Sequence, residues 1–85
     1  MSRNKLKLVD QWEKSCASFL VGKTIKSVRY MTEKEVKNSM WYKAPLIIEF
    51  TDGSYIFSMA DDEGNDGGAY YTSDKKLPTI PVIQY

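Results

Sequence analysis

Two apolar runs joined by a short polar turn constrain the fold of this chain more than any other feature. The runs 45–50 (PLIIEF) and 54–59 (SYIFSM) are rich in β-branched and aromatic residues, which favour strands. They are separated by Thr51-Asp52-Gly53, and an Asp-Gly pair favours positive φ at both central positions of a tight turn. The sequence therefore predicts a β-hairpin closed by a type I′ turn.

The alternation of side chains in this hairpin predicts which residues share a face. In the first strand one face carries Leu46, Ile48 and Phe50, and in the second one face carries the residues 55, 57 and 59. The other face of the hairpin carries Ile47 and Ile56, which predicts partial cover there by a helix or a second subunit.

An amphipathic helix is predicted over residues 5–20. Apolar side chains recur there at spacings of three and four, and Gly22 follows at a typical helix end. The stripe consists of Val9, Trp12, Cys16, Phe19 and Leu20. We expect this stripe to pack on the sheet, with Trp12 and Phe19 as core anchors and Cys16 as a small buried hydrophobe.

The segment between the helix and the hairpin predicts a strand and a second, short helix. Residues 24–30 are rich in β-branched side chains and alternate as a strand does, with Ile25 out of phase through a bulge. Thr32 and Glu35 have the spacing of a capping box, in which each side chain bonds the other residue's backbone. A short helix should therefore follow over residues 33–39.

The C-terminal part predicts a further strand over 69–72 and an extended tail over 77–83. Two prolines in the tail remove backbone donors, so it suits the edge of a sheet and not its centre. With 85 residues the chain forms a single domain, 1–85. We predict an α+β fold: an N-terminal helix packed on a small, mostly antiparallel, twisted sheet that curls toward a partly open barrel.

Composition excludes several kinds of function. The chain has one cysteine and no histidine, so an internal disulfide, the usual zinc and copper sites and histidine-based catalysis are all excluded. This favours a protein that is not an enzyme. No apolar run approaches the ~20 residues of a membrane helix, and the N-terminus lacks the apolar region of a signal peptide. We expect a cytoplasmic protein without a membrane partner.

The net charge of +1 hides an asymmetry between the two halves of the chain. Residues 1–43 contain ten basic and four acidic residues, a formal +6, whereas 44–85 contain two basic and seven acidic residues, a formal −5. Such a dipolar surface favours solubility, and it is also what an acidic partner or head-to-tail self-association would use. A nucleic acid bound by the basic half ranks third among the functions considered.

The segment 61–69 (DDEGNDGGA) places four carboxylates, one amide and three of the five glycines in nine residues. Neither register of the EF-hand pattern fits, because a ligand or the required glycine is missing in each. The ligand or metal candidates are Asp61, Asp62, Glu63, Asn65 and Asp66. A calcium or magnesium site remains one alternative, although no cofactor is expected. The favoured alternative is a rigid loop of Asx turns, since Asp, Asn and Gly stabilise such turns without a ligand.

Trp41-Tyr42-Lys43 is a second candidate surface, in this case for a binding partner. Such aromatic side chains stack on bases or on a partner protein, but more often they cover the end of a small core.

The segments 22–25, 28–32, 41–42 and 45–46, together with Asp52-Gly53 and the DDEGNDGGA loop, resemble those of a family of small bacterial and phage proteins that has no assigned activity. The resemblance spans about residues 20–83 and implies a shared fold, but it implies no catalytic residue. A phage protein would also suit the Lys-, Asn- and Tyr-rich composition. From the sequence we therefore expect a small non-catalytic interaction module that binds a protein partner or its own copy. The alternative is a protein that binds a small ligand or a hard cation through the 61–66 loop.

Overall fold

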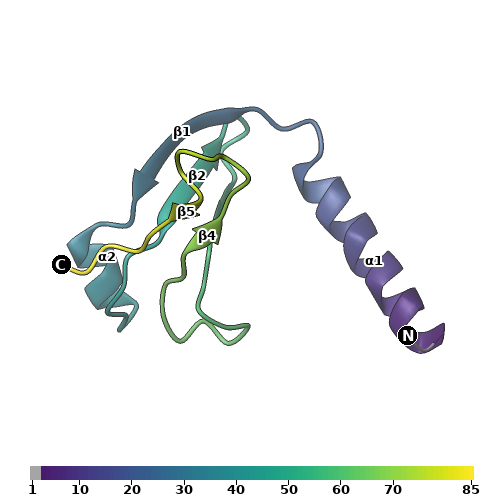
Figure 1. Cartoon of the computed structure of the whole chain (residues 1–85), viewed down its shortest axis with the longest axis horizontal. Helices are drawn as coiled ribbons and strands as arrows, with labels where there is room; N and C mark the ends of the chain where they lie inside the picture. Colours follow the sequence, from purple (N-terminus) through teal and green to yellow (C-terminus); the bar gives the residue numbers. More distant parts are fainter. Residues whose placement is uncertain (1–2) are drawn as a thin grey trace.

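The computed structural model describes residues 3–85 and confirms the α+β class (Figure 1). Its elements are α1 (Arg3–Leu20), β1 (Ile25–Tyr30), α2 (Glu33–Asn38), β2 (Leu46–Phe50), β3 (Tyr55–Phe57), β4 (Tyr70–Tyr71) and β5 (Thr79–Ile80). The first three strands form an antiparallel sheet in the order β1-β2-β3, and β4 and β5 form a separate antiparallel pair. The sheets do not close into a barrel.

The β2–β3 hairpin lies where the sequence predicts it, but the predicted type I′ turn is wrong. Gly53 has a φ of +89°, whereas Asp52 does not have a positive φ. The Gly53 amide donates to the Phe50 carbonyl at 3.1 Å, and the Phe50 amide donates to the Ser54 carbonyl at 2.9 Å. This is the pattern of a three-residue loop with glycine at its left-handed position. The Asp52 carboxylate supports the loop by accepting from the Ser54 amide at 2.9 Å.

Compared with the predicted two-residue loop, the third loop residue shifts the pairing of β2 with β3 by one position. The shift changes which side chains of the two strands share a face of the sheet. Glu49 pairs with Tyr55, Ile48 with Ile56, and Ile47 with Phe57. A shift of one residue moves every side chain of a strand to the opposite face. Ile56 therefore lies on the same face as Ile48, and not with Ile47 as the sequence had indicated.

The main core lies on the Ile47 face of the sheet. Ile47 packs there with Val36 of α2 and with Met31 and Ala44, and the half-buried rings of Trp41 and Phe57 pack around them. The predicted cover of Ile47 by a helix is confirmed, because α2 supplies Val36 to this cluster.

Local signals at both ends of α2 explain its short length. The predicted capping box is present: the Glu35 amide donates to the Thr32 hydroxyl at 3.2 Å, and the Glu35 carboxylate accepts from the Thr32 amide at 2.9 Å. At the C-terminal end Met40 takes a φ of +59°, and the Trp41 amide donates to the Val36 carbonyl at 2.9 Å. With the bond from the Met40 amide to the Lys37 carbonyl, this is a Schellman motif, which ends the helix.

β1 forms one edge of the three-stranded sheet, and the C-terminal segment forms the separate β4–β5 pair beside it. The predicted bulge in β1 is confirmed by a register shift between Ile25 and Ser27. The tail is extended as predicted, and part of it pairs as β5 with β4. The Tyr30 hydroxyl donates to the Pro81 carbonyl at 2.8 Å, and the Tyr70 hydroxyl donates to the Leu46 carbonyl at 3.1 Å. These bonds hold the β4–β5 hairpin against part of the three-stranded sheet (Figure 1).

α1 forms where the sequence predicts a helix, but the expected packing on the sheet is wrong. The helix extends away from the strands, and residues 4–20 are all exposed (Figure 1). Its contact with the sheet is at the C-terminal end, where the Phe19 ring meets the Phe50 ring edge-to-face at 6.4 Å. Cys16 is exposed and not buried as expected. The connection 21–24 joins α1 to β1, and Gly22 within it has a φ of +83°. Neither helix of residues 3–85 has the length and apolar character to cross a membrane.

Candidate functional site

The acidic loop 61–68 connects β3 to β4 and is closed by backbone pairing at its base. The Ala60 amide donates to the Asp66 carbonyl, and the Gly68 amide donates to the Ser58 carbonyl, each at 2.9 Å. Met59 and Gly67 form an isolated antiparallel bridge beside them. The loop is therefore an extension of the β-structure with a fixed entry and exit.

Asp61 organises the first half of the loop. One carboxylate oxygen accepts from the amides of Glu63 at 2.9 Å and Asn65 at 3.3 Å, and the other accepts from the Asn65 side-chain amide at 2.8 Å. The bonds from Asn65 and Glu63 lower the pKa of Asp61 below its usual value, because they stabilise the ionised form. The first half of the loop is thus an Asx turn with its own donors.

Asp66 joins the second half of the loop to the segment before β2. One carboxylate oxygen, Oδ1, accepts from the amides of Tyr42 at 3.1 Å, Lys43 at 2.9 Å and Gly67 at 2.8 Å. Burial opposes the ionisation of Asp66, but the three amides outweigh it, and the pKa of Asp66 is lowered. This carboxylate therefore holds together two segments that lie more than 20 residues apart in sequence.

Two of the loop glycines are required by close backbone contacts. A Cβ at Gly67 would lie 2.2 Å from the Lys43 carbonyl oxygen, and a Cβ at Gly68 would lie 2.7 Å from the Met59 carbonyl oxygen. Both distances are far too short for any side chain, so only glycine fits at these two positions. Packing against neighbouring backbone thus accounts for two of the three loop glycines, and the third, Gly64, has a φ of +72°.

The candidate ligands of the loop thus divide into two groups. The side chains of Asp61, Asn65 and Asp66 bond to the loop and its neighbours. Asp62 and Glu63 are exposed, and the Glu63 carboxylate accepts a 3.5 Å bond from the Asn65 side chain. Among residues 3–85, no three or more Asp, Glu, Cys or His side chains gather in a way that would hold a metal ion. The bonds formed by Asp61 and Asp66 match the Asx-turn alternative, and the calcium or magnesium alternative stays a prediction without a geometric counterpart.

The second sequence candidate, Trp41-Tyr42-Lys43, lies beside the same loop. The Trp41 ring packs edge-to-face on Phe57 at 5.8 Å, and its indole N–H donates to the Gly64 carbonyl at 2.8 Å. Trp41 therefore links the loop to the core. The side chains of Tyr42 and Lys43 are exposed, while their amides bind Asp66.

A hollow of about 430 Å³ beside α2 was not predicted from the sequence. At its edge the Arg29 guanidinium forms a two-pronged ion pair with Glu35, at 2.9 and 3.3 Å, and its Nε lies 3.5 Å from Glu49. The bonds from Arg29 and then from the Thr32 backbone lower the pKa of Glu35 to about 2. These charges satisfy one another, and they link β1, β2 and α2. The alternation of β1 placed Arg29 on a face, but it gave no sign of this ion pair.

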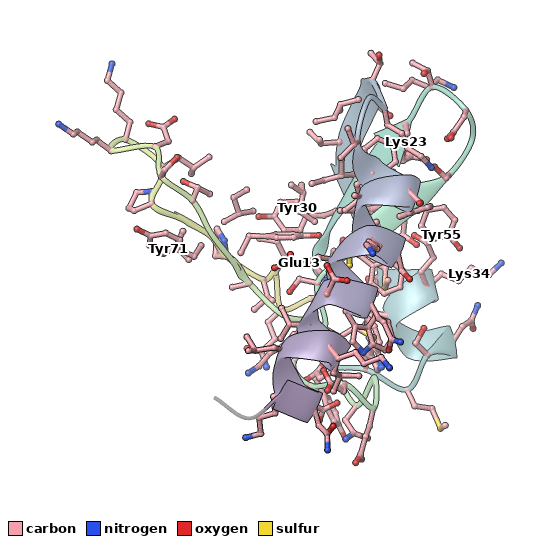
Figure 2. The ribbon with its side chains drawn as sticks, turned by 90° about the vertical axis from the view of Figure 1, so that its right-hand side faces the viewer. Glu13, Lys23, Tyr30, Lys34, Tyr55 and Tyr71 are labelled. Atoms are coloured by element: carbon pink, nitrogen blue, oxygen red, sulfur yellow. The ribbon has the colours of Figure 1, made fainter. Side chains whose placement is uncertain are left out.

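The apolar stripe of α1 is exposed to solvent. The side chain of Trp12, at the middle of the helix, is 65% exposed, and Val9 and Phe19 on the same stripe are also exposed. Figure 2 looks from the side of α1 and shows Lys23 where the helix meets the sheet, with Tyr71 projecting from the distant β4–β5 hairpin. At that junction the Lys23 ammonium lies 3.8 Å from the centre of the Phe19 ring.

The ends of α1 do not stabilise the helix by themselves. Its first turn has basic residues and no acidic one, and its last turn has no basic residue. The basic first turn is the reverse of what the helix dipole favours, and the last turn lacks a stabilising positive charge. A helix of 18 residues without such support is only marginally stable in water, and it gains most of its stability from packing of its apolar face. α1 therefore needs a surface to pack on.

The three-stranded sheet has an apolar face that is only partly covered, which we call the apolar sheet face. Cross-strand pairing places Ile25 opposite Phe50, Val28 opposite Ile48, and Ile48 opposite Ile56 on this face. The β4–β5 hairpin is bonded to one part of the face, but Ile25 is 57% and Val28 is 55% exposed. Two β-branched side chains of a strand are thus left in water beside the base of α1.

The overall dimensions agree with an open arrangement. The radius of gyration is 15.1 Å, against about 12 Å for a compact chain of this length. The accessible surface is 6894 Å², against about 5,200 Å² for a compact monomer of this mass. The chain therefore exposes roughly 1,700 Å² more than a compact fold would.

Comparisons with models of protein families, with curated proteins and with solved structures find no match to this chain. The resemblance stated from the sequence therefore stays a prediction, and the functional argument depends on the geometry.

Proposed function

We propose that this protein is a small non-catalytic interaction module that binds a protein partner through α1. The observation that carries the proposal is the exposed apolar stripe of α1, which its own fold leaves uncovered.

The stripe has the form of a helix that binds in a groove. Such helices present anchors at positions i, i+3, i+7 and i+10 along one face, and the residues here are Val9, Trp12, Cys16 and Phe19. A tryptophan at the centre of the stripe is the residue type that most often dominates the binding energy of an interface.

Other features favour recognition over chemistry. The chain has no histidine, and the Arg29, Glu35 and Glu49 side chains around the hollow are paired with one another. The Asp61 and Asp66 carboxylates accept bonds from the loop itself and from its neighbours. None of these groups is set apart as a nucleophile or a general base.

The proposal is tested by asking whether the α1 stripe stabilises the chain that carries it. In dilute solution, with light scattering to confirm a monomer, Trp12→Gln should change the free energy of unfolding by less than about 0.5 kcal/mol, as exposed sites do. Ile47→Ala, in the buried cluster, should cost about 2–4 kcal/mol.

Ser18→Gln places the same side chain on the opposite face of α1 and serves as the matched control. If Trp12→Gln destabilises the dilute monomer as much as Ile47→Ala does, the stripe belongs to the chain's own core and the proposal is wrong.

A further inference from the structure

We infer that the partner of α1 is a second copy of this chain, and that two copies exchange their helices, so that each α1 packs on the apolar sheet face of the other. This inference rests on the proposed function and names the partner.

The first argument is that one chain carries both halves of the interface. The stripe of α1 includes Trp12 and Phe19, and the exposed part of the apolar sheet face includes Ile25 and Val28. The two surfaces meet at their edge, where Phe19 contacts Phe50, but the open position of α1 keeps the rest apart. An element that leaves its own sheet can make the same contact with a symmetric copy, which is the geometry of domain exchange.

The connection between α1 and the sheet suits such an exchange. Residues 21–24 form no helix or strand, and Gly22 takes a φ of +83° with open space around it. A helix that folds back over its own sheet would require a reversal within these four residues. The outward turn at Gly22 directs α1 away from its own chain, where a second copy is able to accept it.

The second argument is the exposed area. A stable interface buries about 800 Å² on each partner. The chain exposes roughly 1,700 Å² more than a compact monomer, so burying half of that excess would already supply an interface of this size. In an exchanged dimer each copy contributes twice, once with α1 and once with its sheet, so the contact occurs in duplicate.

The third argument is charge. The N-terminal half of the chain carries a formal +6 and the C-terminal half −5, and α1 has no acidic residue before Asp10. Figure 1 shows the N-terminal end of α1 and the acidic loop on the same, lower side of the molecule, with the helix end farther to the right. If α1 lies on the partner's sheet with its N-terminal end on the side of the partner's acidic loop, its basic end approaches the exposed Asp62 and Glu63 carboxylates. Attraction between the basic end of α1 in one copy and the acidic loop of the other therefore favours the dimer over the monomer.

The test is sedimentation of the full chain over a range of concentrations, with acrylamide quenching of tryptophan fluorescence on the same samples. The signal of Trp12 is obtained by subtracting that of Trp12→Phe. We expect a dimer in which Trp12 is protected from acrylamide. Trp12→Gln and Val28→Gln should each weaken dimerisation at least tenfold, while Ser18→Gln, on the opposite face of α1, should change it less than twofold.

Mixing the two weakened variants identifies the exchange itself. In a mixed dimer the unaltered helix of Val28→Gln meets the unaltered sheet of Trp12→Gln, so one contact is fully restored and both substitutions fall in the other. Trp12 and Val28 would lie in the same contact, so once one substitution has weakened it the second costs less than it does in an intact contact. The mixture should therefore form more dimer than either variant alone. A dimer held by helix-to-helix contact would show no such gain, and that result would overturn the inference.

The other outcomes separate this inference from the proposed function. A monomer whose Trp12 is quenched freely overturns the exchanged dimer but leaves α1 available to a different protein. A monomer whose Trp12 is protected shows that α1 folds onto its own sheet, and both statements are then wrong. A dimer that is insensitive to Trp12→Gln and Val28→Gln associates elsewhere and also overturns the inference.

Discussion

Asp66→Ala removes one acceptor and thereby leaves three backbone amides without a partner. The amides belong to Tyr42, Lys43 and Gly67, and all three donate to the same carboxylate oxygen at 2.8–3.1 Å. At this partly exposed site each bond is worth about 1 kcal/mol net, so the variant should lose about 3 kcal/mol of unfolding free energy. For a domain of this size that corresponds to a fall in melting temperature of about 12–24 °C.

Two further variants separate the geometry of Asp66 from its charge. Asp66→Asn keeps the acceptor oxygen and loses the charge, so it should cost about 1 kcal/mol. Asp62→Ala removes an exposed carboxylate from the same loop and should change stability by less than about 0.5 kcal/mol. Urea unfolding at pH 7, followed by circular dichroism, measures all three.

The dependence on pH gives an independent check. Because the pKa of Asp66 is lowered in the folded chain, its contribution to stability is present above the unfolded value of about 3.9 and is lost as the pH falls through the folded value. The stability gap between the native chain and Asp66→Asn should therefore stay constant near neutral pH and narrow as the pH falls below about 3.9. Equal losses for Asp66→Ala and Asp62→Ala, together with stabilisation by millimolar calcium, would refute this reasoning and favour a cation site.

Four other substitutions test the backbone geometry and one ion pair. Gly67→Ala should destabilise the chain by more than about 2 kcal/mol in thermal unfolding, because its Cβ would collide with a backbone carbonyl. Gly22→Ala, with the same substituent in open space at positive φ, should cost only about 1 kcal/mol. Met40→Gly should stabilise the chain by about 0.5–1 kcal/mol, because Met40 is 86% exposed and occupies a left-handed position. Glu35→Gln should cost at most about 1 kcal/mol at pH 7, since solvent screens this half-exposed pair with Arg29. That effect should vanish in unfolding experiments as the pH falls from about 4.3 toward 2, where Glu35 becomes protonated in the folded chain.

The elements that the sequence predicted best are those set by neighbouring residues. Thr32 and Glu35 lie three positions apart, and their two mutual bonds form with little help from the rest of the fold. The bulge at Ile25 was visible as a break in the alternation of β1. The capping box lies within one turn of helix, so the sequence pattern contains the whole interaction. The bulge forms against β2, but it leaves its mark in the alternation of β1 itself.

The hairpin shows where a local pattern is insufficient. Asp52-Gly53 located the turn correctly, but the same pair fits a two-residue loop and a three-residue loop. The structure has the longer one, in which the Asp52 carboxylate bonds the Ser54 amide and glycine alone takes a positive φ. The additional residue of the three-residue loop sets the register of β2 with β3, and therefore the face of the sheet on which Ile56 lies.

The acidic loop shows what composition leaves undetermined. Four carboxylates in nine residues need either a cation or hydrogen-bond donors, and the sequence is compatible with both. Asp61 finds its donors within the loop, which is a local and foreseeable arrangement. The donors to Asp66 include the Tyr42 and Lys43 amides, which belong to a distant segment and become neighbours only after folding.

The periodic pattern of α1 identifies the apolar face of the helix, but it does not identify the surface that covers this face. The spacing of Val9, Trp12, Cys16 and Phe19 establishes which face of the helix must leave water, but it does not state which molecule covers that face. The sequence reading assigned the cover to the chain's own sheet, whereas the structure leaves the stripe and the side chains of Ile25 and Val28 exposed together. Exposure of either apolar surface to water is unfavourable, and each surface can bury the other. An exchange of helices between two copies would bury both apolar surfaces in the same contact. For this reason the open position of α1 points to association of the chain with a second copy.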